Sequence, residues 1–237
     1  LNVKAKLLKF YPEKEQRGGS FNVISELFCD DGPGMQVPLS TFEGGLFDSF
    51  HFTRELNDDA SFYSKSRITH HLDSRARKNL QEIHGRIVKP GMKVLDLMAS
   101  WQSHLSGKKT DFKLTGIGMN IDELEANPLL SKKVIHNLND SPLLPFESST
   151  FDVVICTVSV EYLINPVAVL EEVQRILKPE GIVIITVSDR WFPGKEVLFW
   201  KDLHSFERQG YCIQLLHRVA GFTDIRSESV RGYPRPE

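Results

Sequence analysis

The chain lacks the features that mark several large classes of protein. Its three cysteines, Cys29, Cys156 and Cys212, form neither an even disulfide set nor a metal-ligand spacing. No apolar run approaches the ~18 residues of a membrane span. The net charge of -2 creates no field that would attract nucleic acid or an acidic membrane surface. These absences predict a cytoplasmic globular protein that contacts neither a nucleic acid nor a membrane.

Apolar runs bounded by turn residues alternate with helical patterns through most of the chain. Strands are expected near Lys93–Asp96, Phe112–Ile117, Val134–Ile135, Phe151–Val158, Ile182–Val187 and Phe222–Ile225. Helical spacing from Ile68 to Ile83 predicts a helix that stops at Gly85, and a turn and helix are expected directly after the strand that ends at Asp96. Further helices are expected from Asp122 to Asn127, from Pro166 to Leu177 and between Phe206 and Ala220.

This alternation predicts an α/β fold with a doubly wound, mostly parallel sheet. Residues 1–50 show weak alternation and many turn residues, which predicts an N-terminal appendage, with a hairpin as one arrangement. Residues 51–237 then form the main domain. The loops after the first four strands of that domain should line one crevice, because ligands bind at the carboxyl ends of such strands.

Four segments then occur in the order and spacing of a known family. They are Val94-Leu95-Asp96, Leu144-Pro145-Phe146, Ser149 to Val154, and Leu177-Lys178-Pro179-Glu180-Gly181. Over residues 62–225 the chain resembles class I S-adenosylmethionine-dependent methyltransferases, and most closely the type 11 group. The resemblance implies a Rossmann-like methyltransferase fold, S-adenosylmethionine as cofactor and a small molecule as methyl acceptor.

The resemblance also implies which residues contact the cofactor. Asp96 and the loop Met98-Ala99-Ser100 should hold its methionine part, although the family's glycines are missing from this loop. Gly118 stands where the family has an acid for the ribose, which leaves Asn120 as the nearest polar candidate beside Met119. Asn137, followed by Leu138, stands where an acid meets the adenine amino group, and its amide oxygen can accept the same hydrogen bond. A subgroup of similar sequences shares these departures, which favours a variant pocket over a decayed one.

Other polar and aromatic residues have more than one interpretation. Tyr63, Arg67 and His71 can cover the methionine end of the pocket, bind an acidic substrate, or form an ordinary polar helix face, since Arg67 and His71 are spaced for one face. Trp101 and His104 either shape the loop or pack beneath it. Ser159, Glu161 and Tyr162 follow the fourth strand, where the acceptor would approach. Glu161 and His71 are the candidate bases, with an exposed carboxylate as the simpler interpretation of Glu161, and Trp191, Phe192 and Trp200 either roof the pocket or complete the core.

Two functions from different classes therefore remain. The first is a methyltransferase that acts on an unidentified small molecule. The second is a methyltransferase-like module that only binds or scaffolds, which the missing glycines and the missing acid would explain. The dinucleotide fingerprint Gly-x-Gly-x-x-Gly is absent after the first strand of the main domain, which argues against a nicotinamide enzyme.

Overall fold

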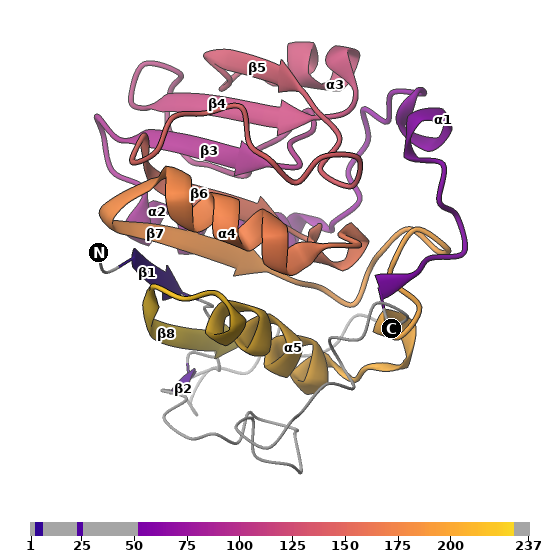
Figure 1. Cartoon of the computed structure of the whole chain (residues 1–237). Helices are drawn as coiled ribbons and strands as arrows, with labels where there is room; N and C mark the ends of the chain where they lie inside the picture. Colours follow the sequence, from indigo (N-terminus) through magenta and orange to yellow (C-terminus); the bar gives the residue numbers. More distant parts are fainter. Residues whose placement is uncertain (1–2, 7–22, 26–51, 230–237) are drawn as a thin grey trace.

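The structure, a computed structural model, describes residues 3–6, 23–25 and 52–229. Its centre is a sheet with the strand order β2-β8-β1-β7-β6-β3-β4-β5. The strands β3 (Lys93–Leu97), β4 (Lys113–Gly118), β5 (Lys132–Ile135), β6 (Phe151–Thr157) and β7 (Leu177–Thr186) pair in parallel. The chain runs from β3 outward to β5, then returns to β6 and continues in the opposite direction, so the strand order reverses between β3 and β6 (Figure 1). The predicted α/β, doubly wound fold is confirmed.

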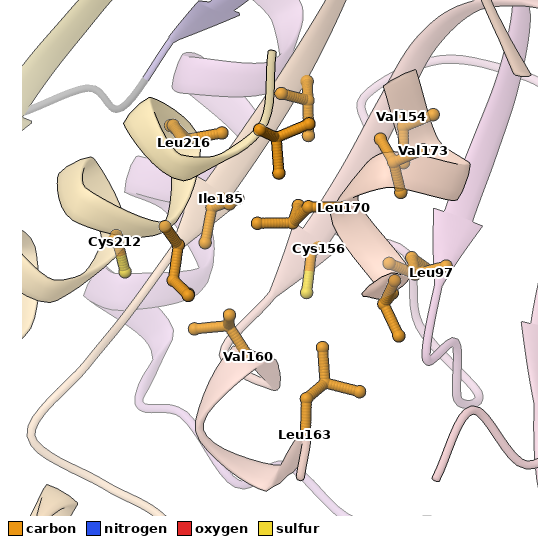
Figure 2. Packing of buried hydrophobic residues seen from close by; sticks show 14 of the residues in the cluster. Leu97, Val154, Cys156, Val160, Leu163, Leu170, Val173, Ile185, Cys212 and Leu216 are labelled. Atoms are coloured by element: carbon orange, nitrogen blue, oxygen red, sulfur yellow. The ribbon is translucent and has the colours of Figure 1, made fainter. Parts of the chain in front are cut away.

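Helices cover both faces of the sheet. In Figure 1, α4 (Pro166–Ile176) and α5 (Ser205–Arg218) lie in front of it and α2 (Ser74–Ile87) lies behind it. Successive residues of β6 alternate between two apolar clusters: Val154 and Cys156 belong to one, Val153 and Ile155 to the other. Figure 2 shows the first cluster, where Leu170 from α4 and Cys212 from α5 pack over the central strands. The clusters account for the apolar character of the central strands, which are buried on both faces.

Side chains define the helix starts. Asp73 caps α2 by accepting the Ala76 N–H at 2.8 Å, and Asn165 caps α4 with Pro166 at the first helical position. Asn120 caps the short helix α3 (Ile121–Ala126). No helix in the described parts of the chain is long and apolar enough to cross a membrane.

The structure corrects the two helices expected around β3. Helix α1 (Asp59–Tyr63) is short, and the chain from Ser64 to Asp73 is not helical, so Arg67 and His71 do not share a helix face. Gly85 lies inside α2 instead of ending it. No helix follows β3, because residues 98–112 form a loop up to β4. The helical spacing of Ile68 was misleading, since this side chain is 55% exposed.

Two smaller differences concern strands. The expected turn at Lys178-Pro179-Glu180-Gly181 lies within β7, where the pairing with β6 shifts register and Glu180 has a φ of 63°. Strands β1 (Val3–Lys6) and β2 (Val23–Ser25) do not pair with each other as a hairpin would: β1 pairs in parallel with β7 and with β8 (Phe222–Ser229), and β2 pairs with β8. The remaining residues of the expected appendage, including Cys29, lie outside the described residues.

Candidate active site

A cavity of about 830 Å³ opens at the carboxyl ends of the central strands, where the strand order reverses. This volume lies in the range of small-molecule pockets, roughly 300–1,000 Å³. Every residue that the sequence nominated for cofactor contact lines it: Tyr63, Arg67, His71, Asp96, Met98, Ala99, Ser100, Gly118, Met119, Asn120, Asn137, Leu138 and Ser159. The fold therefore brings together residues that are up to 96 positions apart in the sequence.

Asp96 lies at the floor of the cavity, at the end of β3. Its side chain is 3% exposed, one carboxylate oxygen pairs with Ser103, and Oδ2 has no partner among the described residues. Burial raises the pKa of Asp96 to about 7, and the hydrogen bond from Ser103 only partly opposes this. No helix follows β3, so Asp96 does not act as a helix cap. The carboxyl group is instead poised to respond to a charge placed in the cavity.

Residues 98–104, the first part of the loop after β3, contain no glycine but include two residues in a glycine-like conformation. Met98 has a φ of 59° and His104 a φ of 50°, in the left-handed region that costs an L-residue about 1–2 kcal/mol. Asn127, which ends α3, holds this loop by donating from Nδ2 to Ser100 O and to Ser103 Oγ, both at 2.9 Å. A third strained residue, Val158 with a φ of 49°, lines the same cavity at the end of β6. Such strain is concentrated at functional sites.

At Gly118, at the end of β4, the structure has no room for the ribose-binding acid that the resemblance implies. A Cβ on Gly118 would lie 2.3 Å from Ala99 O, so no side chain fits there. The amide of Asn120 makes three hydrogen bonds within the protein: its Oδ1 accepts the Glu123 N–H at 3.0 Å, and its Nδ2 donates to Tyr63 O and Ser64 O. Asn120 thus joins the end of α1 to the start of α3 and keeps one lone pair on Oδ1, and its contact with the ribose stays a prediction.

Glu123 is a residue that sequence reasoning missed. It lies in the first turn of α3, is 8% exposed and lines the cavity. Its Oε2 accepts from Ser100 Oγ at 2.6 Å, and its Oε1 accepts from the Arg67 N–H at 2.7 Å. It therefore joins the loop after β3 to the segment that precedes α2.

On the β5 side, Asn137 keeps an available acceptor. Its Oδ1 accepts the Asn139 N–H at 3.0 Å, which uses one of the two lone pairs of an amide oxygen.

Trp101, on the opposite side of the cavity, donates from Nε1 to Thr69 O at 3.1 Å and contacts the ring of His70. Trp101 therefore shapes the rim of the cavity, one of the two roles expected for it.

A buried ionic cluster closes the far end of the cavity. Asp59 accepts from both Arg54 and Lys195, and also from Asn139 at 2.8 Å. Burial alone would raise the pKa of Asp59, but these three donors outweigh it and hold the pKa below its ordinary value. The cluster fixes residues 54–59 against the loop that follows β7, where Leu56 N also donates to Gly194 O. None of these residues was nominated from the sequence, because Lys195 and Asn139 contact Asp59 from 136 and 80 positions away.

Aromatic side chains form the wall between this cluster and β6. The rings of Tyr162 and Phe192 stack with centroids 5.9 Å apart, and Tyr162 Oη accepts the Phe192 N–H at 2.8 Å. The guanidinium of Arg67 lies 4.2 Å from the ring centroid of Phe62 and 5.7 Å from that of Phe192. His71 packs edge-on against Phe192, and burial lowers its pKa below the ordinary value. Trp191 and Phe192 thus line the cavity, whereas Trp200 is fully buried in the core.

Glu161 differs from its expected exposed position. It is 0% exposed, does not line the cavity, and neither of its carboxylate oxygens has a partner among the described residues. Burial raises the pKa of Glu161 to about 8. A carboxyl that is sealed in the core cannot take a proton from a substrate, which leaves His71 as the base candidate that faces the cavity.

Comparison with known proteins adds to this geometry. Residues 113–185 match a family model described as a methyltransferase domain. This part of the chain, which runs from β4 to β7, is therefore similar to a methyltransferase domain. It is 26% identical over 169 residues to the ubiquinone/menaquinone biosynthesis C-methyltransferase of Shewanella putrefaciens, covering 67% of this chain and 66% of that relative. The corresponding protein of Shewanella baltica is 27% identical over 157 residues, with 62% of each chain covered.

The chain thus spans no more than 66% of the length of these relatives. Among solved structures, a SAM-dependent methyltransferase from Aquifex aeolicus is similar over 62% of this chain and 83% of its own, at 17% identity and a TM-score of 0.45. A phosphoethanolamine N-methyltransferase of Haemonchus contortus is similar over 54% and 30%, at 13% identity and a TM-score of 0.41.

The residues that line the cavity fit S-adenosylmethionine, the cofactor that the similarity to methyltransferases implies. The cofactor carries a positive charge on sulfur and on its amino group, and among the described residues the cavity-lining side chains of Asp96 and Thr157 each have an oxygen, Oδ2 and Oγ1, with no hydrogen-bond partner. The remaining lone pair of Asn137 Oδ1 suits an amino group such as that of adenine. In the part of the chain that the structure describes, no group of three metal-ligating side chains occurs.

Proposed function

We propose that this methyltransferase domain transfers a methyl group from S-adenosylmethionine to a small planar molecule. The observation that carries the proposal is that all residues nominated for cofactor contact line one cavity together with an aromatic wall. The cavity has two sides. Asp96, Ala99, Ser100, Gly118 and Asn137 would hold the cofactor, and Tyr63, Ser159, Tyr162 and Phe192 would hold the acceptor.

The cofactor supplies an electrophilic methyl group, so the protein's main task is to align the acceptor with it. Alignment of two bound reactants can contribute about 7–11 kcal/mol to lowering a barrier. The rigid features of this cavity suit that task, because the stacked pair Tyr162 and Phe192 is fixed by a hydrogen bond and Asp59 secures the adjacent segment. For an acceptor that must lose a proton, the neutral imidazole of His71 is the proposed base.

A hydroquinone or phenol is the acceptor class that we favour. Flat rings pack well against the rings of Tyr162 and Phe192, and such pairs contribute roughly 0.5–1.5 kcal/mol beyond the buried area. The relatives from Shewanella are named as ubiquinone/menaquinone biosynthesis C-methyltransferases, which is consistent with a ring acceptor.

The second candidate, a module that binds without turnover, rests on the glycine-free loop. Met98 takes the left-handed conformation that glycine would take without cost, so the loop geometry persists despite the substitution. This observation favours the variant pocket over the decayed one.

The test is a methyl-transfer assay with radiolabelled S-adenosylmethionine and a panel of short-chain hydroquinones, phenols, amines and carboxylates. Labelling of a hydroquinone or phenol that is lost in Phe192→Ala supports the proposal. Cofactor binding without labelling of any panel member would favour the non-catalytic module, and labelling confined to amines or carboxylates would contradict the ring acceptor.

A further inference from the structure

Among the described residues, the buried carboxylate of Glu123 has no ion-pair partner, although Glu123 lines the cavity. Glu123 is 8% exposed, and within the described part of the chain its carboxylate accepts hydrogen bonds from Ser100 Oγ and the Arg67 N–H alone. The guanidinium of Arg67 donates to Lys65 O at 3.2 Å instead. His71 is a titratable neighbour that interacts electrostatically with Glu123. A buried acid with so little compensation is costly unless a ligand supplies further donors.

The two hydrogen bonds orient the Glu123 carboxylate and use half of its lone-pair sites. A carboxylate offers about four lone-pair sites, two on each oxygen. Ser100 uses one on Oε2 and Arg67 uses one on Oε1. One acceptor site therefore remains on each of two adjacent oxygens. This arrangement matches a ligand that presents two hydroxyl groups on neighbouring carbons.

The other polar groups named at this end of the cavity are weaker acceptors. Gly118 has no room for a side chain beside Ala99 O, and the Asn120 amide uses both N–H donors and one of its two oxygen lone pairs within the protein. Asn120 also caps α3, which places Glu123 three residues later at the helix start, next to the end of β4. Glu123, which is charged and keeps one lone pair on each of its two oxygens, is therefore a stronger acceptor for a ligand than Asn120.

We infer that Glu123 binds the two ribose hydroxyls of the adenosyl ligand and so determines that the site takes a ribonucleoside. The inference rests on the proposed cofactor pocket. A charged acceptor strengthens each hydrogen bond, and the pair of them would distinguish a cis-diol from an analogue that lacks one hydroxyl. Ser100 and the backbone of Arg67 act as positioning groups, because they hold the carboxylate in the orientation that the diol needs.

The test is calorimetric titration of the full chain with S-adenosylhomocysteine and with its 2′-deoxy and 3′-deoxy analogues. For the wild-type chain we expect each deoxy analogue to bind about 10- to 100-fold more weakly, the range for one hydrogen bond to a charged group. Glu123→Gln should weaken S-adenosylhomocysteine about tenfold or more and reduce the discrimination to within about threefold. The control is Asp122→Asn, which removes the same charge from an exposed neighbour in the same turn of α3 and should leave both values unchanged.

Each outcome bears on a different claim. If the wild-type chain binds S-adenosylhomocysteine but does not distinguish the deoxy analogues, or if Glu123→Gln still distinguishes them, the inference about Glu123 fails and the cofactor pocket stands. If the wild-type chain binds none of the three ligands, the cofactor pocket and the inference fail together. The wild-type comparison needs no variant, so a folding defect in Glu123→Gln, detected by circular dichroism, does not affect it.

Discussion

Gly118 and Ala99 approach so closely that a Cβ on Gly118 would lie 2.3 Å from the Ala99 carbonyl oxygen. The contact presses the loop after β3 onto the end of β4, and it fixes the shape of the cavity between them. Gly118→Ala should therefore displace the loop, lower stability by about 1–3 kcal/mol and weaken S-adenosylhomocysteine binding about tenfold or more.

Gly85 provides the control for that variant. A Cβ on Gly85, inside α2, meets nothing within 4 Å. Gly85→Ala should raise stability by roughly 0.5–1 kcal/mol, because alanine is the better helix former, and should leave binding unchanged. Urea unfolding and calorimetry measure both quantities, and a Gly118→Ala protein as stable as wild type would refute the close contact.

Asp96 should limit the stability of the ligand-free protein at high pH. Burial raises its pKa from 3.8 to about 7, so the folded state binds the proton more tightly than the unfolded state. The stabilisation that the tightly held proton of Asp96 contributes is fully present below the unfolded-state pKa of 3.8, and it is lost as the pH rises through about 7. Asp96→Asn should thus be more stable than wild type at pH 8, by on the order of 3 kcal/mol, and the gain should shrink towards pH 5.5. The same variant should lose affinity for S-adenosylmethionine.

Glu161→Gln is the control that separates the effect of Asp96→Asn on stability from its effect on ligand binding. Burial raises the pKa of Glu161 to about 8, so this substitution should also stabilise the protein above that pH, with the same sign and cause. Glu161 does not line the cavity, and binding should persist. Thermal unfolding between pH 5.5 and 9 tests the pair, and a stability difference independent of pH in both variants would contradict these pKa shifts.

At Met98 a glycine variant should be more stable than an alanine variant, which is the reverse of the usual order. At an ordinary position glycine is less stable than alanine by roughly 0.5–1 kcal/mol, but at a φ of 59° only glycine avoids the Cβ clash. Met98→Gly should therefore be more stable than Met98→Ala by about 1 kcal/mol. Met119, which also lines the cavity but has no positive φ, should show the ordinary order. If urea unfolding shows the glycine variant to be less stable than the alanine variant at both positions, the backbone of Met98 is not strained.

Substitution of Asp59 should lower stability more than substitution of any other member of the buried cluster. Asp59→Asn leaves Arg54 and Lys195 as two buried cations that have lost their carboxylate, at a cost of about 3–5 kcal/mol. The double variant Asp59→Asn with Lys195→Met should recover part of that loss, because one uncompensated charge is removed. Strictly additive losses in urea unfolding would show that the two residues do not interact.

The central strands could be predicted because their burial on both faces leaves continuous apolar runs between turn residues. Val153, Val154 and Ile155 show this in β6. The cavity could be located for a related reason, since parallel strands bring their carboxyl ends to one edge. The non-helical segment before α2 could not be predicted, because its path depends on two long-range hydrogen bonds. Glu123, 56 positions away, accepts from the Arg67 N–H, and Trp101, 32 positions away, donates to Thr69 O.

The absent helix after β3 and the role of Glu123 depend on similar long-range contacts. Asn127 satisfies the loop backbone at Ser100 from 27 positions away, and no local pattern in the sequence marks this hydrogen bond. Glu123 looks like an ordinary acidic residue in the first turn of a capped helix, where acids are common. Only the folded chain shows that its carboxylate lies between the loop and Arg67.

The measurement that tests the central claim most directly is calorimetric titration of the purified chain with S-adenosylmethionine and S-adenosylhomocysteine, each in two buffers of different ionisation enthalpy at pH 7. We expect micromolar binding of both, with a buffer-dependent enthalpy that shows proton release, because a cationic ligand beside Asp96 favours its ionised form. Asp96→Asn should abolish the proton release. Absence of binding by either ligand would contradict the assignment of this cavity as the cofactor pocket.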